Sequence, residues 1–328
     1  MEGIMHRMVS VNGINMHIAE KGEGPVILFL YGFPQLWYTW RHQILALSSL
    51  GYHAVAPDLR GYGDSDAPAS SSSYTCLHIV GDLIALIDQF GVEQVFLVAH
   101  DWGAIVGWYL CLFRPDRVKA FVCLSVPYKP RNPKMKPVEG RACDFSMEMT
   151  ITFADFRFFI FFFSPLEPGE IEAEIARAGT AEVLKKIWTI RKPGAPCMPK
   201  ENSFEICPEN PSTLPSWLKE EDLAYYVSKF NQKGFTGGLN CYRAMDLNWE
   251  LTASWTDVEV KVSIKFVVGD LDMVYTTPGI KEYVHSSGFR HCAPLLKDIV
   301  VMEGVGHFIN EERAEEINTL IYDFIRKY

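Results

Sequence analysis

The stretch from Phe96 to Ile105 limits what this chain can fold into more than any other part of it. It continues an apolar, β-branched run that begins at Val95, and the small residues Ala99, Gly103 and Ala104 then lie close to Asp101 in the sequence. The apolar run favours a buried strand, and the small residues permit a tight turn. Beyond the turn the apolar positions recur at helical spacing. The sequence therefore predicts a strand, a sharp turn and a helix, with the Asp101 carboxylate at the apex of the turn.

Length and composition are those of an ordinary globular protein. The 328 residues are 48% hydrophobic and 22% charged, which is enough to bury a large core. A net charge of −9 without a cluster of Lys or Arg argues against nucleic-acid binding. The N-terminus lacks the apolar core of a signal peptide, and the eight cysteines show no metal-ligand spacing. We therefore expect a cytoplasmic protein with no membrane span, no metal and no cofactor.

Short apolar runs and helical patterns alternate along most of the chain. A hairpin is expected at Met8–Ile18, because Asn12-Gly13 tolerates the positive φ of a tight turn. Such alternation predicts a mainly parallel sheet with helices on both faces. Buried strands are predicted at residues 25–30, 53–57, 95–98, 119–123, 264–268 and 298–302, and helices at residues 40–50, 76–89, 103–113, 279–285 and 311–325.

The alternation stops between Tyr128 and Leu247. Helical patterns fill this segment, notably at residues 171–186 and 218–230, and no run in it is typical of a buried strand. We interpret the segment as a helical lid inserted into the sheet domain. An aromatic run at residues 153–163 is expected to pack the lid onto the core or to line a substrate cavity. The expected domains are a first core part (1–127), a lid (128–247) and a second core part (248–328).

Two further candidate residues follow predicted strands. Asp272 stands just beyond the strand that ends at residue 268, and His307 lies in a glycine-rich loop after the last strand. Active residues of parallel sheets gather at the carboxyl ends of strands, so both are expected near Asp101. The order nucleophile, acid, histidine is that of the α/β-hydrolase fold, whose nucleophile also stands on a strand–turn–helix elbow. Asp270 competes with Asp272 for the acid role.

An aspartate nucleophile suits a different reaction from a serine. A carboxylate, with an ordinary pKa of about 4, is already an anion at neutral pH, and it can open a strained or activated C–X bond by displacement at carbon to form an alkyl ester. His307, oriented by Asp272, would then activate water against that ester. The oxyanion that forms needs backbone N–H donors, and Trp102 at the start of the helix supplies one.

Several motifs together resemble those of the soluble epoxide hydrolases, especially the plant enzymes. The similarity covers nearly the whole chain, and it implies an α/β-hydrolase core with a helical lid. It also implies an enzyme that converts an apolar epoxide into a vicinal diol through a covalent ester. The motifs include Gly32-Phe-Pro34, Trp40-Arg41, Pro57-Asp-Leu-Arg-Gly-Tyr-Gly-Asp-Ser65, His100-Asp-Trp-Gly-Ala104, Asn248-Trp-Glu-Leu-Thr252 and Gly304-Val-Gly-His-Phe308.

The resemblance implies a role for each matching position. Tyr242 matches one of two lid tyrosines that protonate the epoxide oxygen as the ring opens. The implied partners are a small-molecule epoxide and water, with no cofactor, and the protein is expected to be a monomer or a homodimer. The other matches are the nucleophile Asp101, the acid Asp272, the base His307 and the oxyanion-hole donors Phe33 and Trp102. The expected substrate contacts are Pro34, Trp37, Tyr128 and Phe161.

Two positions depart from the family pattern. Tyr31 stands where the family usually has a histidine before Gly32, and the place of the first lid tyrosine falls near Phe161. With one phenol fewer, epoxide opening is expected to be about a hundredfold slower, or the site is adapted to another substrate or to cyclisation. A haloalkane-type dehalogenase, which shares the aspartate nucleophile, and a non-catalytic ligand receptor are the alternative hypotheses.

Overall fold

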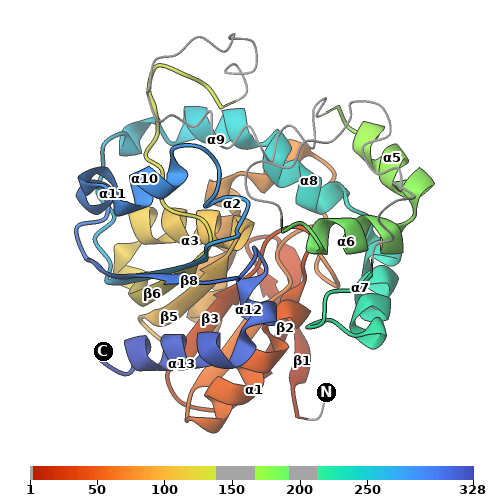
Figure 1. Ribbon diagram of the computed structural model, residues 1–328, viewed down its shortest axis with the longest axis horizontal. Coiled ribbons are helices and arrows are strands. Elements are labelled where there is room, and N and C mark those ends of the chain that lie inside the picture. Colours follow the sequence, from red (N-terminus) through yellow and green to blue (C-terminus); the bar gives the residue numbers. More distant parts are fainter. Residues whose placement is uncertain (1–2, 138–166, 192–212) are drawn as a thin grey trace.

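The computed structural model of the chain describes residues 3–137, 167–191 and 213–328 (Figure 1). Within these ranges the sheet has the strand order β1-β2-β4-β3-β5-β6-β7-β8. The aromatic run at residues 153–163, with Phe161, lies outside the described residues. The strands are β1 Met5–Val11, β2 Ile14–Lys21, β3 Val26–Leu30, β4 His53–Pro57, β5 Val95–His100, β6 Val118–Leu124, β7 Ile264–Gly269 and β8 Leu296–Met302.

The sheet is mainly parallel, as predicted. β3 to β8 pair in parallel, while β1 with β2 and β2 with β4 pair antiparallel. The hairpin between β1 and β2 turns at Asn12 and Gly13, whose φ angles of 44° and 81° are those the sequence required there. β5 lies beside β6, and β7 and β8 follow in order, so the loops after these four strands open at one edge of the sheet.

Helices flank the sheet (Figure 1). α1 (Arg41–Ser49) packs against α13 (Ala314–Ile325), and α2 (Cys76–Gln89) packs against α3 (Trp102–Phe113). The expected C-terminal helix is divided, because Arg313 takes a φ of −130° between a short α12 (Ile309–Glu312) and α13. Two further helices, α10 (Ile280–His285) and α11 (Ser287–Cys292), lie between β7 and β8.

The described part of the expected lid is helical. The single helix predicted at residues 171–186 is wrong, because Gly179, at a φ of 87°, divides it into two. The expected boundary at residue 247 falls inside a helix, and the division into core and lid segments stays a prediction. The helices are α5 Glu170–Ala178, α6 Thr180–Trp188, α7 Glu220–Lys233, α8 Thr236–Arg243 and α9 Met245–Leu251.

One hydrophobic cluster joins the sheet domain to these helices. It contains strand residues such as Leu97 together with Val183, Tyr226 and Tyr242 from α6, α7 and α8. Figure 1 shows α8 and α9 close to α2 and α3, at one end of the sheet. The lid helices therefore share a core with the sheet and cover one end of it.

Among the described residues, no helix is both long enough and apolar enough to cross a membrane.

Candidate active site

Asp101 stands at the sharp turn between β5 and α3, as the sequence predicted. Its φ of 55° and ψ of −126° lie outside the usual regions for a residue with a side chain, and it is only 3% exposed. Such a conformation costs about 1–3 kcal/mol and must be held by its surroundings. Gly103 permits it, because a Cβ at that position would meet the backbone carbonyl of Leu30. The glycine at position 103 is thus explained by close contact between α3 and β3.

The predicted nucleophile, base and acid lie together at the carboxyl ends of their strands. His307 Nε2 is 3.4 Å from Asp101 Oδ2, and His307 Nδ1 is 3.0 Å from Asp272 Oδ2. Asp272 also accepts a hydrogen bond of 2.7 Å from the Val274 backbone N–H. One imidazole therefore bridges two carboxylates, and its Nε2 side faces Asp101.

Asp270, the competing acid, has a different position. Its Oδ1 accepts hydrogen bonds from the backbone N–H groups of Gly304 (2.7 Å) and Val305 (3.3 Å). It therefore holds the loop that carries His307, while Asp272 faces the imidazole. Asp270 thus fixes the loop, and Asp272 orients the histidine that the loop carries.

The two carboxylates shift the pKa of His307, and His307 in turn shifts the pKa of Asp272. Burial by itself would lower the pKa of His307, but the adjacent Asp272 and Asp101 outweigh it and raise that pKa to about 10. Burial would raise the pKa of Asp272, but His307 and hydrogen bonds to the carboxylate lower it below its ordinary value. The resting site therefore holds a protonated His307 between two carboxylates.

The loop after β3 places backbone donors against Asp101. The Phe33 N–H donates a hydrogen bond of 2.8 Å to Asp101 Oδ1. A Cβ at Gly32 would meet both that oxygen and the Trp102 backbone nitrogen, so the loop packs directly on the start of α3. Tyr31 points elsewhere: its hydroxyl donates to Asp58 Oδ1 over 3.2 Å and accepts from the Leu59 N–H. The unexpected tyrosine thus anchors the β3 loop to the β4 loop.

Tyr242 reaches the site from α8. Its ring meets Trp102 edge to face at 4.8 Å and Phe33 at 6.1 Å, and the side chain is fully buried. Burial, followed by the charge of Asp101, raises the pKa of its phenol well above the ordinary value, so the phenol keeps its proton. A Cβ at Gly237, in the same helix, would meet the Gly61 carbonyl oxygen. The glycine pair 237–238 therefore lets α8 approach the core closely, a signal that the sequence interpretation missed.

The structure places the remaining predicted contacts less directly. Trp37 donates from its indole N–H to the Tyr225 hydroxyl over 2.8 Å, at the contact between α7 and the core. Tyr128 packs its ring on Trp108 at 5.5 Å. Pro34 is buried and follows Phe33 through a cis peptide bond. The substrate-binding roles of these residues stay predictions, and that of Phe161 concerns a residue outside the described ranges.

Three residues near His307 were missed by the sequence interpretation. Ser125, the residue after β6, places its Oγ 3.0 Å from His307 Nδ1. The Nε2 atom of His100 is 2.8 Å from the His307 carbonyl oxygen, and its Nδ1 atom is 3.0 Å from Gln35 Oε1. Burial lowers the pKa of His100 to about 4, so this side chain is neutral. The available signal was the position of Ser125 at a strand end, between the strands of Asp101 and Asp272.

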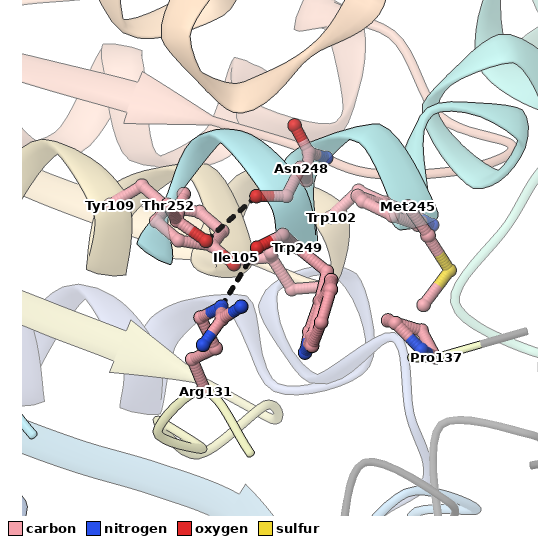
Figure 2. Close-up of a pocket in the computed structure, with 9 residues that line it drawn as sticks. All are labelled: Trp102, Ile105, Tyr109, Arg131, Pro137, Met245, Asn248, Trp249 and Thr252. Carbon is pink, nitrogen blue, oxygen red and sulfur yellow. Dashed lines mark hydrogen bonds between the residues drawn. The ribbon is translucent and has the colours of Figure 1, made fainter. Parts of the chain in front are cut away.

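An apolar pocket adjoins Trp102 (Figure 2). It lies between α3, α9 and the segment around Arg131, whose Nε donates to the Trp249 carbonyl over 2.8 Å. The Arg131 guanidinium stacks on the Trp249 ring at 4.0 Å. Such a wall suits an apolar ligand beside Trp102. The lining residues are Trp102, Ile105, Tyr109, Arg131, Pro137, Met245, Asn248, Trp249 and Thr252.

Comparisons with known proteins identify the family of this chain. Residues 25–142 match the family model of the α/β hydrolase fold. The chain is 56% identical to epoxide hydrolase 2 of Siraitia grosvenorii over 100% of both chains. It is 35% identical to epoxide hydrolase A of Mycobacterium tuberculosis, over 97% of this chain and 96% of that one. This chain belongs to the epoxide hydrolases.

Solved structures of epoxide hydrolases give the same result. A variant of the Vigna radiata epoxide hydrolase superposes with a TM-score of 0.92 at 59% identity, over 100% of both chains. A variant of the Solanum tuberosum enzyme gives a TM-score of 0.90 at 53% identity, over 99% of this chain and 100% of that one. The expected fold class and family are confirmed.

Proposed function

We propose that this protein hydrolyses an apolar epoxide to a vicinal diol through a covalent ester on Asp101. The observation that carries the proposal is the surroundings of the Asp101 carboxylate. One oxygen accepts a hydrogen bond from the Phe33 N–H and the other faces His307 Nε2, while the Tyr242 ring meets the adjacent Trp102 ring edge to face. A nucleophile, a base and an acid of suitable pKa therefore meet in one buried space.

In the first half-reaction Asp101 attacks an epoxide carbon. The C–O bond of the ring breaks as the ester bond forms, and the released oxygen takes the proton of Tyr242. A phenol with a raised pKa keeps that proton until an alkoxide is produced, which is what a general acid requires. The apolar pocket beside Trp102 supports an apolar substituent on the substrate.

In the second half-reaction His307 activates water. Esterification removes the negative charge of Asp101, so the pKa of His307 falls from about 10, and the proton it releases replaces the one given by Tyr242. Neutral His307 then takes a proton from water, whose oxygen adds to the ester carbonyl. The Phe33 N–H is placed to stabilise the oxyanion. Collapse then breaks the ester C–O bond, and the departing alkoxide takes the second proton of the added water, which frees the diol, restores the Asp101 carboxylate and leaves His307 protonated.

A single turnover in ¹⁸O-labelled water tests the covalent step. Hydrolysis at the ester carbonyl leaves the label in the Asp101 carboxylate, so mass analysis of that peptide should find ¹⁸O. An unlabelled Asp101 after one turnover to diol would contradict the proposal. Asp101→Asn, which cannot form a stable ester, is the control that should lose both diol formation and label.

Tyr242→Phe tests the acid. Loss of one charge-assisted hydrogen bond of about 2–3 kcal/mol in the transition state should slow ester formation about a hundredfold. Stopped-flow measurement of ester formation reports this step. Tyr322→Phe, in the distant α13, is the matched control and should leave it unchanged. An unaffected rate in Tyr242→Phe would remove Tyr242 from the mechanism.

The cytoplasmic location and the oligomeric state expected from the sequence stay predictions.

A further inference from the structure

Ser125 occupies a particular place in the sheet. It follows β6, which lies between β5, the strand that leads to Asp101, and β7, the strand that leads to Asp272. Its backbone N–H donates to the Val267 carbonyl over 2.9 Å, and this bond ties it to β7. Ser125 therefore stands at the carboxyl end of the middle strand, between the two carboxylates.

The side chain of Ser125 faces the pair formed by His307 and Asp272. Its Oγ is 3.0 Å from His307 Nδ1 and hydrogen-bonds the Asp272 carboxylate as well. A carboxylate only accepts hydrogen bonds, so the Ser125 hydroxyl donates to Asp272. Its lone pair then faces the Nδ1–H of His307. This arrangement stabilises the tautomer that carries its proton on Nδ1 and leaves Nε2 toward Asp101.

The backbone of Ser125 is held in an unfavourable conformation. Its φ of 75° lies in the left-handed region, and the residue is fully buried. Serine has no special preference for this region, so the conformation costs about 1–3 kcal/mol. A glycine would avoid the cost but would supply no hydroxyl. The hydroxyl is thus the property that distinguishes serine from the residue favoured by the backbone.

We propose that Ser125 is a positioning residue for the second half-reaction: its hydroxyl holds Asp272 and the Nδ1 side of His307, so that Nε2 faces the ester on Asp101. This inference rests on the proposed function for its kinetic consequence. Ester formation needs no base, whereas ester hydrolysis needs a neutral, correctly oriented imidazole. Loss of the hydroxyl therefore slows the hydrolytic step selectively.

Two variants separate the hydroxyl from the backbone. Ser125→Ala removes the hydroxyl and keeps the Cβ, while Ser125→Gly removes both and relieves the positive φ. In both we expect hydrolysis of the ester to slow about tenfold, the value of one net hydrogen bond, with ester formation unchanged. The ester should then accumulate on Asp101 and be visible as a mass increase in quenched samples. A glycine variant that hydrolyses the ester at the wild-type rate would overturn the proposal.

A double-mutant cycle shows whether Ser125 acts through Asp272. In an Asp272→Asn background the carboxylate that Ser125 holds is gone, so Ser125→Gly should slow hydrolysis no further. Additive losses in the double variant would mean that Ser125 acts by another route and would contradict the inference. The cycle is measured on the rate of ester hydrolysis alone. A general loss of stability would not slow this step selectively over ester formation.

A measurement on the resting protein makes failure of this inference distinguishable from failure of the proposed function. The proton on His307 Nδ1 should give a low-field NMR resonance, because it lies between Asp272 and Ser125 oxygens. We expect that resonance to move in both Ser125 variants, whether or not any epoxide is turned over. An unchanged resonance would overturn the inference. A moved resonance in a protein that forms no ester on Asp101 would refute the proposed function alone.

Discussion

His307 shows how strongly single residues in this site depend on their neighbours. Two carboxylates raise its pKa to about 10, although burial by itself would lower it. In the proposed mechanism a base that is protonated at rest becomes useful only when one of those charges disappears, which happens on esterification of Asp101. Under this proposal the nucleophile controls when the base becomes available.

Asp101→Asn should lower the pKa of His307, because the asparagine removes one of the two raising charges. In the wild type the pKa of His307 lies above its ordinary value of 6.5, so its stabilising contribution is full below pH 6.5 and is lost as the pH rises through about 10. We expect the wild type to lose more unfolding free energy than the variant between pH 6.5 and 10. Urea unfolding across this pH range checks the prediction. Equal losses of unfolding free energy in the wild type and the variant would contradict it.

At the scale of elements, close packing of α8 on the core puts Tyr242 against Trp102, the residue that follows Asp101. Gly237→Ala would push its Cβ into the Gly61 carbonyl, and backbone cannot move aside as a flexible side chain can. We expect slower ester formation and a cost of about 1–3 kcal/mol in unfolding free energy. Gly288→Ala in α11 is the matched control, since its Cβ would meet side-chain atoms rather than backbone: the Ser286 hydroxyl at 3.2 Å and the Tyr283 ring at 3.7 Å. Equal rates of ester formation and equal unfolding free energies in the two variants would refute this explanation.

A buried arginine connects three helices. Arg41 of α1 bonds Glu311 of α12 at 2.8 Å and contacts Asp222 of α7 at 3.4 Å. Arg41→Gln should leave a buried Glu311 without its cation, at a cost of about 3–5 kcal/mol in unfolding free energy. Burial already raises the pKa of Glu311, and removing Arg41 raises it further. The loss should therefore be larger at pH 8 than at pH 5, where more Glu311 is protonated.

Chemical unfolding at the two pH values measures this effect. The matched control is Arg326→Gln, because Arg326 pairs with Asp323 at the surface and its side chain is 56% exposed. Exposed pairs contribute only about 0–1 kcal/mol, so this variant should stay close to wild type at both pH values. A stability loss in Arg41→Gln that does not depend on pH would contradict the role given to Glu311.

At the scale of the whole molecule, the lid helices and the sheet share one hydrophobic cluster. Residues such as Tyr226 of α7 pack with the core, so the lid buries its apolar side chains only when the sheet is folded. We expect a single cooperative thermal transition, with equal calorimetric and van't Hoff enthalpies. Differential scanning calorimetry checks this. Two resolved transitions would show that the lid unfolds by itself.

The sequence by itself determined the local structure around the site. Small residues at Gly103 and Ala104 required a tight elbow, Asn12-Gly13 required a hairpin, and strand-end positions indicated Asp272 and His307. These signals are readable because each depends on a few neighbouring residues. Helix ends were less readable, since Gly179 and Arg313 break continuous apolar patterns. The apolar pattern of a sequence shows which face of a helix is buried, whereas the position where a helix breaks depends on the backbone angle of one residue.

Only the tertiary structure decided how distant residues divide their roles. Strand-end position alone did not separate Asp270 from Asp272, and only the family resemblance favoured Asp272. In the structure Asp270 holds the loop of His307 and Asp272 faces its imidazole. Ser125 gave no signal as a residue type, because its contact depends on β6 lying between β5 and β7. Strand order and long-range contact are properties of the folded sheet. The sequence therefore determined which groups could react, and the order of the strands decided which of them meet.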